Sequence, residues 1–175
     1  GLAAVQVAKC LGATVIATGR SPEKLEVVKA QGADHVVCIR NEDGTPGVRR
    51  FRDDVKELTG GKGADVVFDG VGGDVSLESL RCVRFGARFL IVGWASTPFV
   101  ARGKGLRGAP NANQLPTNLI MMKGLDVLGC PAVISAQHDP TLRDQRKRDL
   151  MAWVEAGHLV PYISHTFPLA QAKEA

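Results

Sequence analysis

The sequence predicts an α/β fold in which a parallel sheet is covered by helices on both faces. Short β-branched runs alternate with longer segments of helical periodicity along the chain, and this alternation is typical of parallel sheets. Several of the apolar runs end in glycine, as at Gly19, Gly70 and Gly93. Because parallel crossovers are right-handed, the favoured topology is a doubly wound sheet.

The expected helices are marked by apolar spacing and by capping residues. Leu2 and Val5 begin a helical pattern that stops at Gly12, a typical residue just after a helix end. Ser21, Pro22 and Glu23 supply an N-cap, a proline for the first turn and an acid near the positive helix end. We expect helices at residues 1–11, 21–31, 48–58 (with Phe51, Val55 and Leu58 inward), 76–83, 115–123 and 140–156, and the start of another at 167–169.

Strands are expected where short apolar runs lie between turn-forming residues, at 14–18, 35–39, 65–69, 88–93 and 125–129. Residues 94–114 are rich in Gly, Pro and Asn and predict a long loop. The central stretch is 63–73, in which Val66, Val67 and Phe68 precede Asp69 and a cluster of glycines. Ligands of parallel sheets lie beyond the carboxyl ends of strands, so this cluster is either a cofactor-binding turn or simply a tight turn.

Composition excludes several classes of protein. The chain has 175 residues, 45% apolar and 23% charged, which is one domain of ordinary globular composition. No apolar stretch reaches the roughly 18 residues of a membrane span. The cysteines at 10, 38, 82 and 130 have no zinc-site spacing and are expected to be reduced thiols of a cytoplasmic protein. A net charge of +4 suits an anionic ligand without indicating nucleic acid.

An ordered set of motifs carries a family resemblance. The opening residues 1–13 are similar to the helix that follows the AxGGVG turn in medium-chain dehydrogenase/reductases. Further matches follow in order at SPEK (21–24), QGADH (31–35), LTGGKGAD (58–65), DGVGG (69–73), 88–96, WVEAG (153–157) and FPL (167–169). Together they resemble the zinc-free NADPH:quinone oxidoreductase branch over nearly the whole chain.

The resemblance implies that residues 1–175 form a partial Rossmann domain, truncated at both ends. In the family, the first strand and a GroES-like catalytic domain precede the position of Gly1, and further strands follow that of Ala175. The first strand would lie between residues 14–18 and 65–69, and its neighbours would otherwise have unpaired backbone groups. We therefore expect residues 1–175 alone to be weakly stable, to bind dinucleotide poorly and to be inactive.

The expected cofactor is NADPH. NAD-preferring relatives place a carboxylate at the end of the second strand, where it binds the ribose 2′-hydroxyl. Here Gly19, Arg20 and Ser21 occupy that position, with Lys24 in the following helix. Cations and hydroxyls bind a 2′-phosphate that a carboxylate would repel. Glu23 is explained by capping alone, and the alternative for Arg20 and Lys24 is that they are ordinary exposed cations.

The resemblance implies further cofactor contacts. Lys24 and Arg40 would contact the 2′-phosphate, with Ile39 standing where the family often has a tyrosine. Val71 and the turn 92–95 match segments that line the nicotinamide side; the alternatives are core positions for the valines and a half-buried surface indole for Trp94. The full expected set is Gly1, Leu2, Gly19, Arg20, Ser21, Lys24, Arg40, Val71, Val92, Gly93, Trp94 and Ala95.

No catalytic or metal-binding constellation stands out in the sequence. The histidines at 35, 138, 158 and 165 have no partner at metal or triad spacing. Asp65 and Asp69 share one side of a strand, but Asp69 is better placed to accept hydrogen bonds from the backbone of the glycine turn. The resemblance implies direct hydride transfer from the nicotinamide to a quinone or to the activated C=C bond of an enone, which requires no metal or covalent nucleophile.

Two other functions stay open. A zinc-dependent alcohol dehydrogenase of the same superfamily would have its metal ligands upstream of Gly1. A non-catalytic RNA-binding protein would use the basic loop 94–107 and the cations of 143–148, but this is less favoured because no aromatic platform accompanies them. The resemblance also suggests a homodimer formed through the edge strand 125–129, since a bare apolar edge favours aggregation.

Overall fold

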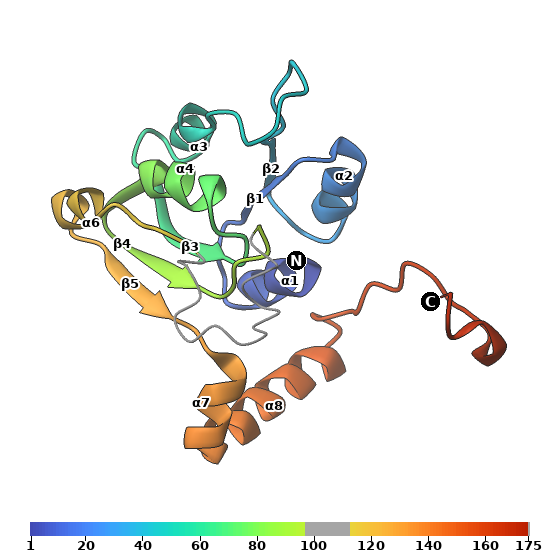
Figure 1. The fold of residues 1–175 in the computed structure, drawn as a ribbon. Coiled ribbons are helices and arrows are strands. Elements are labelled where there is room, and N and C mark those ends of the chain that lie inside the picture. The colour runs from blue at the N-terminus through green and yellow to red at the C-terminus, as the bar shows by residue number, and fades with distance from the viewer. Residues whose placement is uncertain (97–112, 175) are drawn as a thin grey trace, which may run out of the picture.

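The computed structural model describes residues 1–96 and 113–174, and its strands form two parallel sheets. In the first sheet, β1 (Ile16–Gly19) pairs with β2 (His35–Cys38). In the second, β4 (Val83–Ile91) lies between β3 (Ala64–Asp69) and β5 (Asp126–Gly129). Helices alternate with these strands along the chain and lie beside them in Figure 1, so the predicted α/β class is confirmed.

The helices are α1 (Leu2–Cys10), α2 (Pro22–Ala30), α3 (Arg52–Leu58), α4 (Asp74–Cys82), α6 (Thr117–Lys123), α7 (Ala132–His138) and α8 (Pro140–Glu155). A short 3₁₀ turn covers Leu169–Gln171, where the start of a helix was expected. The short helix α7 was not predicted, and most of the expected loop 94–114 lies outside the described residues.

The prediction of a helix from residue 48 is wrong. The helix begins only at Arg52, because the preceding residues bond back to the end of β2. The Arg49 amide donates to the Ile39 carbonyl, and the Arg49 side chain donates to the Cys38 carbonyl at 2.7 Å and to Asp54. Phe51 is buried as expected, whereas Leu58 is 37% exposed rather than inward.

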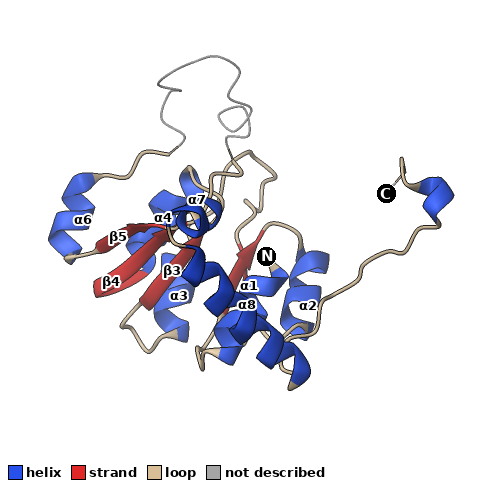
Figure 2. Cartoon of the chain, turned by 90° about the horizontal axis from the view of Figure 1, so that it is seen from below, coloured by secondary structure: helices blue, strands red, loops and turns tan. Residues whose placement is uncertain are grey.

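One face of the second sheet is packed and the other is open. The packed side carries Phe89, which is fully buried with Leu80 and packs with the 9%-exposed Leu125 under α4 and α6. On the opposite face, Phe68 is 56% exposed and pairs in register with Leu90 and then Leu128. Figure 2 shows the three strands side by side, with α6 beside β5.

The two sheets have no strand between them among the described residues, and no ladder hydrogen bonds join β1 to β3. The interval between β1 and β3 is where the sequence predicts that a first strand would fit.

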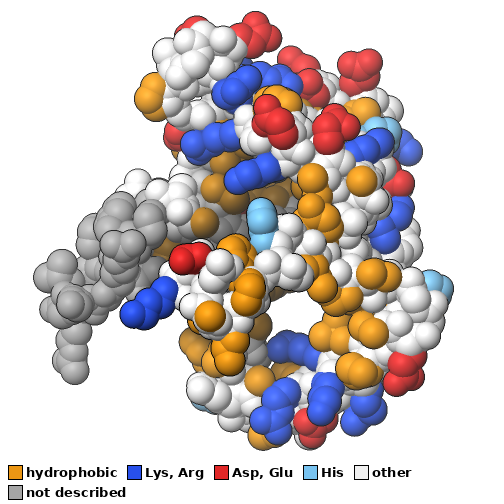
Figure 3. All heavy atoms as spheres, turned by 90° about the vertical axis from the view of Figure 1, so that its right-hand side faces the viewer, with side chains coloured by type: hydrophobic (Ala, Val, Ile, Leu, Met, Phe, Trp, Pro, Cys, Tyr) orange, Lys and Arg blue, Asp and Glu red, His pale blue; other side chains and the backbone are white. Residues whose placement is uncertain are grey.

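The C-terminal part returns to α1 after α8. The Gln6 side-chain amide donates to the Val160 carbonyl at 2.8 Å. No residue of α8 is buried. Figure 3 shows hydrophobic side chains around a hollow on this side of the molecule, so apolar surface is left uncovered. None of the helices in the described ranges is both long enough and apolar enough to cross a membrane.

Candidate functional site

The turn that follows β3 is held by the buried carboxylate of Asp69. Its Oδ1 accepts from the amides of Val71 at 2.8 Å and Gly72 at 3.0 Å. Its Oδ2 accepts from the hydroxyl of Ser76, in the first turns of α4. Gly72 and Gly73 have φ of +80° and +61°, a conformation that side chains other than glycine rarely adopt. The prediction that Asp69 satisfies local backbone donors is confirmed.

Asn113 completes this network from a distant part of the chain. Its side-chain oxygen accepts from the Gly73 amide at 3.1 Å, and its side-chain nitrogen donates to the Ser76 hydroxyl at 2.7 Å. Sequence reasoning missed this residue, because the contact spans 40 positions and no local pattern marks one asparagine of the loop.

A second turn, after β4, packs directly on the first. The Val92 amide donates to the Asp69 carbonyl at 2.8 Å, and the Ala95 amide donates to the Gly70 carbonyl at 3.1 Å. A Cβ atom at Gly93 would lie 3.3 Å from that Gly70 oxygen, so the close approach of the two turns favours glycine there. The structure therefore brings together Val71, Val92, Gly93, Trp94 and Ala95, the residues expected to line the nicotinamide side.

The residues expected at the 2′-phosphate lie at the ends of β1 and β2. The Ile39 amide donates to the Gly19 carbonyl at 2.8 Å, which places Arg20 and Arg40 beyond adjacent strand ends. Ser21 is the N-cap of α2, and its hydroxyl oxygen accepts from the Lys24 amide. Arg20, Lys24 and Arg40 are exposed. This corner is open, cationic and adjacent to a helix N-terminus.

Glu23 also belongs to this corner, which capping arguments from the sequence did not show. The Ser21 hydroxyl donates to the Glu23 carboxylate at 2.6 Å. That hydrogen bond is the main cause of a lowered Glu23 pKa, and the positive charge of Arg40 adds to it. A carboxylate thus shares the corner with three cations.

The expected cofactor residues form two groups rather than one. Arg20, Ser21, Lys24 and Arg40 follow the first sheet, whereas the turns at 69–73 and 92–96 follow the second. Both groups lie at carboxyl ends of parallel strands, the edge at which such sheets bind ligands. Gly1 is the N-cap of α1 and Leu2 is its first residue; the Ala4 amide donates to the Gly1 carbonyl at 3.0 Å, whereas the Leu2 and Ala3 amides precede the first bond of the helix.

The titratable groups of the described residues give no sign of a metal centre. No three His, Cys, Asp or Glu side chains gather there at metal-binding distance. The four cysteines are free thiols. Burial raises the pKa of the Cys82 thiol to about 12, so this group stays protonated and unreactive.

Residues 1–142 match the family profile described as "Zinc-binding dehydrogenase". The chain belongs to the zinc-binding dehydrogenase family. This confirms the resemblance to medium-chain dehydrogenase/reductases.

Two relatives in this family align with almost the whole chain. It is 32% identical to the quinone oxidoreductase-like protein 2 homolog of Nematostella vectensis, over 100% of this chain and 43% of the relative. It is also 32% identical to the 2-haloacrylate reductase of a Burkholderia species, over 96% of this chain and 45% of that protein. The chain thus spans less than half the length of these relatives.

Solved structures show the same fold. A crystal structure of 2-haloacrylate reductase superposes with a TM-score of 0.75 at 29% identity, over 97% of this chain and 47% of that one. The Escherichia coli quinone oxidoreductase, solved as a complex with NADPH, superposes with a TM-score of 0.71 over 94% of this chain and 44% of that one. At 24% identity, the latter likeness concerns the fold alone.

Proposed function

We propose that this chain is the cofactor-binding part of an NADPH-dependent oxidoreductase that reduces quinones or activated C=C bonds. One observation carries the proposal. Two structured turns follow the carboxyl ends of β3 and β4, and an open cationic corner follows the carboxyl ends of β1 and β2. The names of the two relatives, a quinone oxidoreductase-like protein and a 2-haloacrylate reductase, support this class of substrate.

The described residues fit a phosphorylated dinucleotide. A Cβ at Gly72 or Gly93 would lie within 3.4 Å of the facing backbone, and one at Gly73 would lie 3.1 Å from the Ser96 hydroxyl. Glycine therefore keeps the two turns of the second sheet close together, where a flat ring can lie against Val71 and the 92–95 turn. Arg20, Lys24 and Arg40 supply cations for a 2′-phosphate, and the N-terminus of α1 supplies amides for the diphosphate. When bound, NADPH supplies the hydride. The residues of this chain hold and orient the cofactor.

The intact domain has a further strand between β1 and β3 in this proposal. Such a strand would pair with the inner backbone edges of both sheets, which carry no ladder partners among the described residues. It would also join the cationic corner after the first sheet and the two turns after the second sheet into one continuous site. Residues 1–175 by themselves are then expected to bind NADPH weakly.

The edge strand β5 forms a homodimer interface in this proposal. Its outer edge has no strand partner in the described part of the chain, and Leu128 beside it is exposed. Pairing with the same strand of a second copy would cover both features.

The test of cofactor choice is the kcat/KM ratio for NADPH and NADH, measured on the full-length protein with a quinone and an enone panel. We expect Arg20→Ala and Lys24→Ala each to lower kcat/KM for NADPH about tenfold, the loss of one charge-assisted bond, and to leave NADH within about twofold. Lys147→Ala removes an exposed cation of α8 and serves as control. Equal losses with both cofactors, or a parent enzyme that prefers NADH, would refute the proposal.

Glu23 gives a change of the opposite sign. Glu23→Gln removes the carboxylate from the cationic corner while keeping a side chain that can bond to Ser21. The NADPH preference should therefore rise. A fall in the preference would mean that Glu23 positions the cations instead of opposing the phosphate.

A further inference from the structure

A cationic cavity lies at the edge of the second sheet opposite the proposed cofactor site. It measures about 530 Å³ and is lined by Arg52, Lys56, Lys62, Arg81, Val83, Arg84, Phe85, Met122 and Lys123. Val83 is the first residue of β4, and Lys62 lies just before β3. The Asp69 turn follows the opposite end of β3. Anything bound in this cavity is therefore separate from the cofactor turns.

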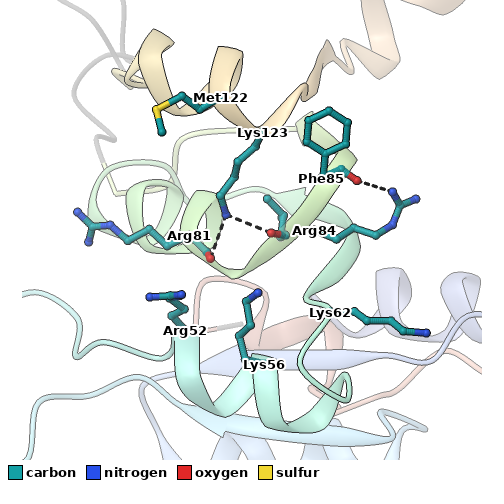
Figure 4. Close-up of a pocket in the computed structure, with 9 residues that line it drawn as sticks. Arg52, Lys56, Lys62, Arg81, Arg84, Phe85, Met122 and Lys123 are labelled. Atoms are coloured by element: carbon teal, nitrogen blue, oxygen red, sulfur yellow. Dashed lines mark hydrogen bonds between the residues drawn. The ribbon is translucent and has the colours of Figure 1, made fainter.

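The lining is strongly positive. Six of the nine residues are Lys or Arg, and none of the nine is Asp or Glu. Arg81 is paired with Glu78, and Arg84 with Asp65, at 2.8 and 2.6 Å. Figure 4 shows Arg81 and Lys62 pointing away from the centre, while Arg52 and Lys56 point toward it from α3. The central charges are thus those of Arg52, Lys56 and Lys123.

Lys123 is a fixed charge at the back of the cavity. Its ammonium donates to three carbonyls at the end of α4, those of Leu80, Arg81 and Val83, at 2.8 to 3.1 Å. Its protons are engaged, so it contributes charge rather than a free donor. Burial lowers the pKa of Lys123, and the neighbouring positive charge of Lys56 lowers it further, with a smaller contribution from Arg52. The charges of Lys56 and Arg52 thus act on the Lys123 ammonium from the facing helix α3.

Arg52 and Lys56 supply the donors. They stand four residues apart on α3, a spacing at which like charges repel and destabilise a helix. The Lys56 ammonium donates one hydrogen bond to the Gly61 carbonyl at 3.1 Å, which leaves two of its N–H groups for a ligand. No hydrogen bond or ion pair engages the Arg52 guanidinium within residues 1–96 and 113–174. An anion held between these two side chains would relieve the repulsion.

We propose that this cavity binds a small polyphosphate anion, a di- or triphosphate group, between Arg52 and Lys56 and in front of Lys123. The volume is in the range of small-molecule sites, and guanidinium and ammonium groups are the usual phosphate ligands. Phe85 and Met122 are 75% and 67% exposed at the rim, where the organic part of a nucleoside diphosphate would lie. The phosphate chemistry is common to inorganic and nucleoside forms, and the experiment separates the two.

The experiment is calorimetric titration of the full-length protein with inorganic pyrophosphate and, separately, with ADP, each with and without saturating NADPH. We expect binding that persists in NADPH, weakens with salt, and falls at least tenfold in the Arg52→Gln/Lys56→Gln variant. The charge-matched control, Arg143→Gln/Lys147→Gln on α8, should stay within about twofold of the parent. If Phe85→Ala weakens the binding of ADP but not that of pyrophosphate, the ligand is the nucleoside form. If Phe85→Ala changes both affinities equally, the site recognises the inorganic phosphate groups.

Three outcomes would overturn the proposal. They are the absence of heat from both probes up to about 10 mM, loss of binding when NADPH is present, and unchanged affinity in the double variant. Because Arg52 and Lys56 are side chains at the surface of α3, circular dichroism and thermal unfolding should match the parent and show that the variant is folded.

Discussion

Replacing Asp69 tests whether one buried carboxylate holds the turn after β3. Its two oxygens accept three hydrogen bonds, from the amides of Val71 and Gly72 and from the Ser76 hydroxyl. Asp69 is 4% exposed and Ser76 is fully buried, so water cannot replace the lost acceptor without rearrangement. In Asp69→Ala all three donors lose their partner.

The expected loss is large. A bond to a charged group contributes about 1.5–3 kcal/mol, and a buried donor left without a partner costs about 1–3 kcal/mol. Since the three bonds share one carboxylate and are not additive, we expect Asp69→Ala to lower the free energy of unfolding by about 3–5 kcal/mol. Asp69→Asn keeps an oxygen for the two amides and should cost about half as much.

The assay is urea unfolding of the full-length protein, followed by circular dichroism, together with the Kd for NADPH. Asp65 on the same strand provides the control, because its side chain is 75% exposed and bonds only to Arg84 in the surface pair. Asp65→Ala should cost less than about 1 kcal/mol. If Asp69→Ala and Asp65→Ala have equal stability, the network does not carry the turn and the reasoning is wrong.

Three further predictions concern other parts of the fold. Gly63→Ala should lower the free energy of unfolding by several kcal/mol, because a Cβ at this residue of φ +94° would lie 2.6 Å from the Cys82 carbonyl oxygen. Gly61→Ala, at φ +82°, would bring no atom within contact and should lower it by about 1–2 kcal/mol. The midpoints of urea unfolding distinguish the two variants. Cys82 should resist iodoacetamide at pH 8 until the protein is unfolded, as peptide mass spectrometry would show, since its thiol has a pKa of about 12. The Arg49 guanidinium lowers the pKa of Asp54, so the pair stabilises the fold above the ordinary aspartate pKa and loses this effect as the pH falls through the lowered value. Asp54→Asn should therefore cost up to about 1 kcal/mol at neutral pH and nothing near pH 2, as unfolding at the two pH values would show.

Local patterns in the sequence were sufficient for much of the fold. Ser21 before Pro22 marks the start of α2, and the structure shows its side chain as the cap. The apolar run 66–68 followed by Asp69 predicts β3 and its turn. Both depend on residues close together in the sequence, since the Asp69 side chain accepts from the Val71 amide two residues later. The parallel pairing followed from the alternation of elements.

Contacts between distant residues were not readable in the same way. The apolar spacing of Val48, Phe51 and Val55 suits a helix, but Arg49 bonds to the end of β2 and delays the helix start. Asn113 joins the Asp69 network across 40 residues, and the proximity of Glu23 to Arg40 depends on how β1 and β2 pair. The cationic cavity likewise collects side chains from separate elements, none of which is conspicuous alone.

The division of the strands into two unconnected ladders has a consequence for motion. Breaking the β1–β2 ladder severs no ladder bond of β3, β4 or β5, so the two sheets are coupled through side chains, in the core that Val37 and Ile39 share with Val75 and Cys82. Amide hydrogen exchange should then show two levels of protection in residues 1–175. A segment or nucleotide that spans both ladders would merge the two levels into a single cooperative opening.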